Sequence, residues 1–172
     1  MDVTRYDKLR DLARTGFSAE SAATVDRALE YAAGALAGRT RYDGTPLLDH
    51  AAAVACIVLG EVGLECNPVV ATLLHDVVRI AHKSLGTKEF TALTARIRES
   101  FGAEVVGITM GLCNISETKL KIDKAQIDNF RDLIVAYSED PRVILIKLAD
   151  RLEVMRSLAI FPREKWRRKS WE

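Results

Sequence analysis

Apolar residues recur along most of the chain at the spacing of three to four residues that places them on one face of an α-helix. Residues typical of helix N-termini precede the successive segments: Thr4, Ser18, Thr45 with Pro46, Asn67 with Pro68, Thr87 and Ser138. The segment 105–113 is the one stretch that could form a strand, but it is short and contains two glycines. The pattern therefore predicts an all-α fold without internal repeats.

Two of the predicted helices, 68–80 and 141–155, are apolar on almost every face, which is typical of central, buried helices. A charged side chain in such a helix must be paired, hydrogen-bonded or bound to a metal, because burying it alone is costly. The polar exceptions are therefore the informative positions: Thr72, His75, Asp76 and Arg79 in the first helix, and Lys147, Asp150, Arg151 and Glu153 in the second.

Composition narrows the class of protein. The chain has 172 residues, of which 48% are hydrophobic and 28% charged, with a net charge of +1. These values exclude a disordered chain, and the near neutrality argues against direct binding of nucleic acid or an anionic membrane. Neither a signal peptide nor a membrane-spanning run is evident, and the three cysteines are widely spaced. We therefore expect a single cytoplasmic domain over residues 1–172.

Four residues could form a metal site. His50 lies early in one predicted helix, His75 and Asp76 are adjacent in a second, and Asp150 interrupts a third. Imidazole and carboxylate donors suit Mn²⁺, Fe²⁺ or Zn²⁺. The spacing by itself leaves open the alternative that these are hydrogen-bonded core residues.

The sequence around these residues resembles the hydrolase domain of RelA/SpoT homologues, the enzymes that make and degrade the alarmones ppGpp and pppGpp. The resemblance begins near Tyr31 and continues to the C-terminus. The segments that carry it include GRTRYDGTPLLDHAAAVACI, ATLLHDVV, RIRESFGAEVVGITMGL, PRVILIKLADRL and MRSL. The motif IKLADRL is highly specific for this family.

The resemblance implies an HD-domain helical bundle and a divalent metal, usually Mn²⁺, held by His50, His75, Asp76 and Asp150. In active members the metal lowers the pKa of a water that attacks the 3′-diphosphate and releases pyrophosphate. The resemblance also implies three nucleotide-binding positions: Arg41, against the guanine base, Asn114 and Ser157.

The chain departs from the family pattern at the positions that accompany the metal ligands. Active members read HDVVED, whereas here Arg79 and Ile80 follow HDVV. Arg79 could reach toward Asp76 or Asp150, or repel the metal, but it cannot act as a general base. Glu153 and Val154 replace the His and Asn of the family motif ADRLHNMR. Asn114 stands where the family has a lysine that meets phosphate, so binding of a highly charged nucleotide should weaken.

These departures predict that hydrolysis is weak or lost. The favoured interpretation is a metal-binding domain from the N-terminal part of a longer protein, which regulates an attached (p)ppGpp synthetase domain. The basic segment 163–169 would then lead into the connector between the two domains. Two alternatives stay open: an active (p)ppGpp 3′-pyrophosphohydrolase in which Glu153 substitutes for the missing pair, or an HD phosphohydrolase that acts on another nucleotide.

Overall fold

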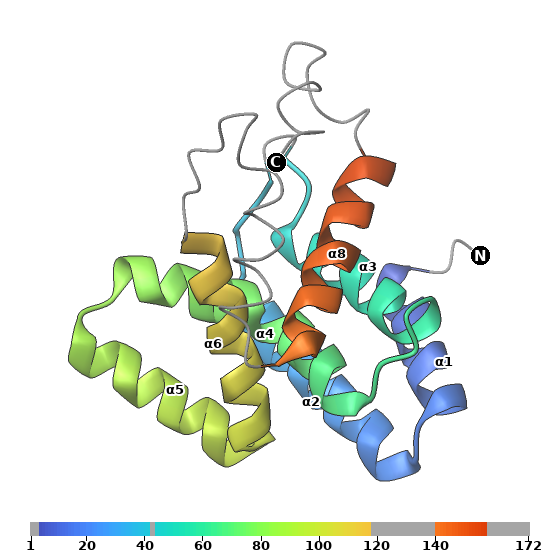
Figure 1. Ribbon diagram of the computed structural model, residues 1–172, viewed down its shortest axis with the longest axis horizontal. Coiled ribbons are helices and arrows are strands. Elements are labelled where there is room, and N and C mark those ends of the chain that lie inside the picture. Colours follow the sequence, from blue (N-terminus) through green and yellow to red (C-terminus); the bar gives the residue numbers. More distant parts are fainter. Residues whose placement is uncertain (1–3, 42–43, 118–139, 158–172) are drawn as a thin grey trace.

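The computed structural model describes residues 4–41, 44–117 and 140–157. In order along the chain these form α1 (Arg5–Gly16), α2 (Ala19–Ala35), α3 (Leu47–Gly60), α4 (Cys66–Ser84), α5 (Thr87–Phe101), α6 (Ala103–Glu117) and α8 (Pro141–Arg156). Within these ranges the structure contains no strand, and its one β-bridge joins Thr40 to Pro46 (Figure 1). The predicted all-α fold is confirmed, and the segment 105–113 is helical as part of α6.

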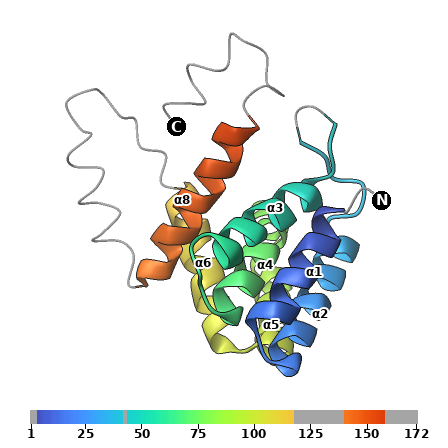
Figure 2. The ribbon, with the colours of Figure 1, turned by 90° about the vertical axis from the view of Figure 1, so that its right-hand side faces the viewer.

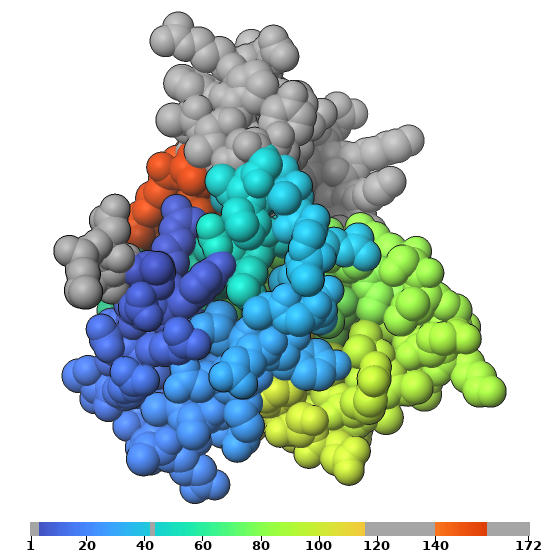
Figure 3. All heavy atoms as spheres, turned by 180° about the vertical axis from the view of Figure 1, so that it is seen from behind, coloured from blue at the N-terminus to red at the C-terminus, as the bar shows by residue number. Residues whose placement is uncertain are grey.

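Helix α4 is the centre of the bundle. It contacts α2, α3, α5, α6 and α8, and its residues 68–78 are all buried (Figure 1, Figure 2). Seen from the opposite side, α1, α2, α5 and α6 cover much of the surface, and part of α3 is also visible (Figure 3). The prediction of a helix buried on every face is therefore confirmed for residues 68–78 of α4, whereas Arg79 is partly exposed. The same prediction is wrong for residues 141–155, because α8 leaves Leu148 62% exposed.

Local signals place the starts of α1 and α2 and the end of α5. The Thr4 side chain accepts a hydrogen bond from the Asp7 amide and completes a capping box at α1, and the Ser18 side chain accepts one from the Ser21 amide at α2. Gly102 ends α5 with a φ of 94°, a left-handed backbone conformation that favours glycine.

Four predicted helix starts are shifted. Helix α4 begins at Cys66, after Glu65 as its N-cap, rather than at Asn67 with Pro68. Helix α8 begins after Asp140, whose side chain caps the Arg142 amide, rather than after Ser138, which lies outside the described residues. Helix α5 has Gly86, not Thr87, as its N-cap. Helix α3 has Pro46 as its N-cap without a side-chain hydrogen bond, so Thr45 does not cap it.

The connection before α3 explains the last difference. The Arg41 amide donates to the Thr45 carbonyl at 2.8 Å, and the Leu47 amide donates to the Arg39 carbonyl at 2.9 Å. These hydrogen bonds pair residues 39–41 with residues 45–47, so the two ends of the connection lie side by side. Arg41 is thereby held beside the first turn of α3, which carries His50.

Several predictions concern segments outside the described residues. The sequence also predicts an amphipathic helix over roughly 116–137, and beyond Glu117 this segment lies outside the described residues, as does the basic segment 163–169. No helix in the described part of the chain has the length and apolar character needed to cross a membrane.

Helix α8 is held against α6 by a close contact at its N-terminal end. A Cβ atom on Gly111 of α6 would lie 2.9 Å from Cγ2 of Val143, a buried residue of α8. Beside this contact, Arg142 of α8 forms an ion pair with Glu104 of α6. The missing side chain at Gly111 therefore sets how closely the two helices approach.

We expect Gly111→Ala to destabilise the protein by about 1–2 kcal/mol, because the branched Val143 side chain must shift in a filled core. The matched control is Gly107→Ala in the same helix, where a Cβ meets no atom within 4 Å. That change should stabilise by up to about 1 kcal/mol through helix propensity. Urea denaturation followed by circular dichroism measures both, and equal effects of the two variants would contradict the close α6–α8 contact.

Candidate functional site

Helix α4 places His75 and Asp76 at the centre of the protein. Both side chains are buried, and the Nδ1 atom of His75 lies 2.6 Å from the Thr72 carbonyl oxygen. A carbonyl oxygen only accepts hydrogen bonds, so Nδ1 carries the proton and donates it. The lone pair of a neutral His75 is therefore on Nε2, which is the form required for a metal ligand.

Asp76 is paired with the arginine that follows it by one helical turn. The Nε atom of Arg79 donates to Asp76 Oδ1 at 2.8 Å, and Nη2 contacts the same oxygen. Burial alone would raise the pKa of Asp76, but its electrostatic interactions with the neighbouring His75 and Arg79 outweigh burial and lower it. The second oxygen, Oδ2, is buried and has no hydrogen-bond partner among the described residues.

His50 of α3 lies between two carboxylates of α8. Its Nε2 atom is 3.0 Å from Asp150 Oδ1, and its Nδ1 atom is 2.7 Å from Glu153 Oε2. Burial alone would lower the pKa of His50, but the hydrogen bonds to Asp150 and Glu153 raise it to about 9. His50 is thus an imidazolium that donates to both acids, and Nε2 must release its proton before it can bind a metal.

Asp150 has a second cationic partner on its own helix. The Nζ atom of Lys147 lies 3.0 Å from Asp150 Oδ2, three residues earlier on α8. Burial opposes ionisation of Asp150, but His50 and Lys147 hold the pKa of this carboxyl well below its usual range. Lys147 is one of the polar exceptions in the apolar helix, and its spacing from Asp150 was the available signal for this contact.

Glu153 lies behind His50, on the side of the ring opposite Asp150. Its two oxygens are each 3.4 Å from Nη1 of Arg41, whose side chain is only 10% exposed. The carboxylate therefore joins the loop that carries Arg41 to the imidazole of His50. This placement argues against Glu153 as a substitute for the missing catalytic pair, because it faces away from Asp150 and is engaged by two cations.

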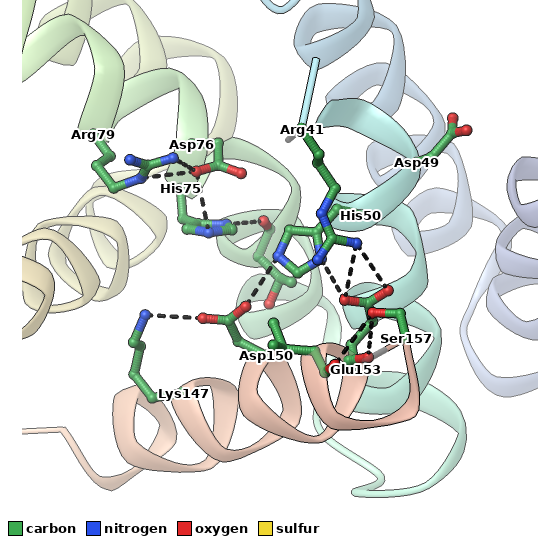
Figure 4. A network of polar contacts seen from close by, with 12 residues as sticks. Arg41, Asp49, His50, His75, Asp76, Arg79, Lys147, Asp150, Glu153 and Ser157 are labelled. Carbon is green, nitrogen blue, oxygen red and sulfur yellow. Dashed lines mark hydrogen bonds and ion pairs between the residues drawn. The ribbon is translucent and has the colours of Figure 1, made fainter. Parts of the chain in front are cut away.

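The four predicted metal ligands come together as two pairs. Figure 4 shows His75 and Asp76 of α4 facing His50 and Asp150 from α3 and α8. The pairs also interact electrostatically, since His75 lowers the pKa of Asp150 and His50 lowers that of Asp76. In the described part of the chain, however, no three His, Cys, Asp or Glu side chains are arranged to hold a metal ion.

The donor set nevertheless fits a divalent cation in its chemistry. It offers two imidazoles and two carboxylates, and the buried Asp76 Oδ2 needs a partner that the described residues do not supply. The carboxylates are instead turned toward cations of the protein, Arg79 and Lys147. Coordination would require these contacts to open.

The other predicted site residues differ in their burial and in their relation to this cluster. Ile80 is half-buried against the core, and Val154 is half-buried on α8 beside Glu153. Asn114 is exposed on α6. The Ser157 hydroxyl donates to the Glu153 carbonyl at 2.9 Å and so binds the end of α8. The nucleotide-binding roles of Arg41, Asn114 and Ser157 stay predictions.

Comparison with known proteins identifies the class. The family model for the HD domain matches residues 28–172, so the chain belongs to the HD domain family. It is 35% identical to the bifunctional (p)ppGpp synthase/hydrolase SpoT of Escherichia coli over 95% of this chain and 22% of that protein. It is 37% identical to the guanosine-3′,5′-bis(diphosphate) 3′-pyrophosphohydrolase of Aquifex aeolicus over 85% of this chain and 19% of that protein.

A solved structure gives the same result in three dimensions. The chain matches a metazoan orthologue of SpoT, described as hydrolysing ppGpp and acting in starvation responses, with a TM-score of 0.61 and 26% identity. The match covers 85% of this chain and 79% of that one. The resemblance to the RelA/SpoT hydrolase domain is thereby confirmed, and the chain spans about a fifth of the length of the curated relatives.

We expect Glu153→Ala to destabilise the protein by about 3 kcal/mol, because it leaves the buried cations of His50 and Arg41 without their shared carboxylate. The matched control is Glu61→Ala, which breaks a pair with Arg156 whose side chains are 48% and 53% exposed. Solvent screens that pair, so little change is expected. Thermal and urea denaturation measure both, and equal losses would show that Glu153 is not part of a buried network.

Proposed function

We propose that this domain is a (p)ppGpp 3′-pyrophosphohydrolase-type HD domain with weak or lost hydrolysis, which binds a divalent metal and regulates an attached alarmone synthetase. The metal ligands would be His50, His75, Asp76 and Asp150. When bound, a divalent ion such as Mn²⁺ would act as a Lewis acid toward water and a phosphate oxygen.

One observation supports the loss of hydrolysis: the three acids of the cluster all have cationic partners. Asp76 pairs with Arg79, Asp150 with His50 and Lys147, and Glu153 with His50 and Arg41. A general base must be able to accept a proton from the attacking water. Within the described residues of the cluster, no carboxylate is left over for this role.

The two positions that follow HDVV reinforce this argument. Arg79 is a permanent cation with no proton-accepting capacity, and Ile80 is an apolar residue packed on the core. Val154 adds no hydrogen bond to a substrate. Arg41, which the resemblance assigns to the guanine base, contacts Glu153 through Nη1, and its side chain is only 10% exposed.

The regulatory half of the proposal rests on the relatives. The Escherichia coli relative is named as a bifunctional synthase/hydrolase, and the Mycobacterium leprae relative, 38% identical over 86% of this chain, as a probable GTP pyrophosphokinase. This chain covers 22% and 17% of those proteins. A domain with a bound metal or nucleotide can bias a neighbouring domain if it binds two states unequally.

We expect the wild-type chain to release pyrophosphate from ppGpp with Mn²⁺ at or near the background rate. Loss of a general base costs about two to four decades in rate. The double variant Arg79→Glu with Ile80→Asp restores two carboxylates and should raise the rate clearly above background. Pyrophosphate release coupled to a colour reaction, with and without a chelator, measures both proteins.

The control for the charge reversal is Arg14→Glu, an exposed position on α1 that is also three residues after an aspartate. This variant should stay at background. Rapid Mn²⁺-dependent turnover by the wild-type chain would refute the loss of hydrolysis. Turnover of a different nucleotide in a panel would support the alternative HD phosphohydrolase.

A further inference from the structure

We infer that Arg79 is an internal counter-ion that competes with a divalent metal for Asp76. In the metal-free domain Arg79 neutralises the buried carboxylate, and metal binding requires the arginine to leave it. The inference rests on the metal site of the proposed function and does not depend on the loss of hydrolysis.

The first argument is the burial of Asp76. This residue is 2% exposed on the central helix, where an uncompensated negative charge is strongly disfavoured. Two nitrogen atoms of Arg79 contact its Oδ1 atom, whereas Nε2 of His75 is farther away at 3.6 Å. Arg79 is therefore the main cation at this carboxylate.

The second argument is that the pairing is incomplete. Arg79 contacts Oδ1 alone, and Oδ2 remains buried without a hydrogen-bond partner among the described residues. A guanidinium that matched the carboxylate fully would contact both oxygens. The unsatisfied oxygen lies on the residue that would serve as a metal ligand, so Arg79 leaves part of this carboxylate unpaired and can be displaced by a cation that satisfies it better.

The third argument is accessibility. The Arg79 side chain is 31% exposed, in contrast to the fully enclosed carboxylate it contacts. Its long stem can swing the guanidinium into solvent without unfolding α4. A guanidinium and a divalent cation on one carboxylate repel each other in a poorly solvated site, so the two occupy Asp76 alternately.

If Arg79 and the metal compete for Asp76, removing the arginine should lower the stability of the metal-free protein and raise its affinity for the metal. Replacing Arg79 with an uncharged residue should destabilise the metal-free protein, because Asp76 loses its counter-ion. The same change should strengthen metal binding and enlarge the stabilisation that added metal produces, since a ligand of the native state stabilises in proportion to its affinity.

The test compares wild-type protein with Arg79→Met, which retains a long apolar stem without charge. Mn²⁺ binding is measured by calorimetry, and melting temperature with and without Mn²⁺. We expect Arg79→Met to bind Mn²⁺ at least about tenfold more tightly, the scale of changes next to metal ligands. Its melting temperature should be lower than that of wild type without metal and rise more when metal is added.

Two controls define the result. Arg14→Met removes the arginine of an exposed pair with Asp11 at the same helical spacing and should leave Mn²⁺ affinity unchanged. Asp76→Asn should abolish the gain in the Arg79→Met background. Equal or weaker Mn²⁺ binding by Arg79→Met would overturn the inference, as would failure of wild type and Arg79→Met alike to bind the ion.

A measurement on the wild-type chain covers the case in which Arg79→Met does not fold. The Arg79 Nε–H proton, hydrogen-bonded to Asp76, should give a protected NMR signal that is absent from Arg79→Lys. Saturation with diamagnetic Zn²⁺ should remove this signal, and its persistence would contradict the competition. Rapid ppGpp hydrolysis by the wild-type chain, together with tighter metal binding by Arg79→Met, would refute the proposed loss of activity and leave this inference intact.

Discussion

The arrangement of this domain depends on placing ionic groups inside its most buried helix. Helix α4 is enclosed by five other helices, yet His75 and Asp76 lie in its middle. A buried carboxylate is tolerated only with compensating positive charge and hydrogen bonds. Helix α4 itself supplies the direct partners, the Thr72 carbonyl for His75 and Arg79 for Asp76. His50 of α3 interacts with Asp76 electrostatically, and His75 does so with Asp150 of α8.

Each carboxylate of the cluster has at least one cationic partner from the protein itself. His50 is shared by Asp150 and Glu153, Lys147 adds a second cation to Asp150, and Arg41 closes the far side of Glu153. Because α3, α8 and the loop before α3 all contribute, the cluster also ties these elements together. Acids that already have cationic partners have little capacity left to accept a proton, and this links the stability of the cluster to the proposed loss of hydrolysis.

The sequence was sufficient for most of the fold because the signals are local. Apolar spacing and caps such as Ser18 report on neighbouring residues, and α2 starts where they predict. Thr45 failed as a cap because the loop around it is paired with Thr40 and Arg41, and hydrogen bonds across a loop leave no trace in a capping pattern.

The site was predictable to a different extent. Its residues could be chosen, since polar positions in apolar helices stand out, and the resemblance named the same four ligands. The hydrogen-bond partners of these residues could not be predicted, because the direction in which Glu153 points depends on how α8 is rotated against α3. Only packing showed that Glu153 meets Nδ1 of His50 while Asp150 meets Nε2. The sequence left open whether Arg79 reaches Asp76, reaches Asp150 or repels a metal. The side-chain geometry of the structure shows that it contacts Asp76.

One face of α8 shows how packing at one end of a helix controls chemistry at the other. Val143 contacts α6 where Gly111 leaves room, and Asp150 follows seven residues later, two helical turns along the same face. Glu153 lies one further turn along. Since a helix moves largely as a rigid unit, a tilt at Val143 would also displace both carboxylates relative to His50 of α3, against which α8 packs directly. The apolar contact and the ionic cluster therefore form one structural unit, in which a change at Gly111 would be felt at the candidate metal ligands.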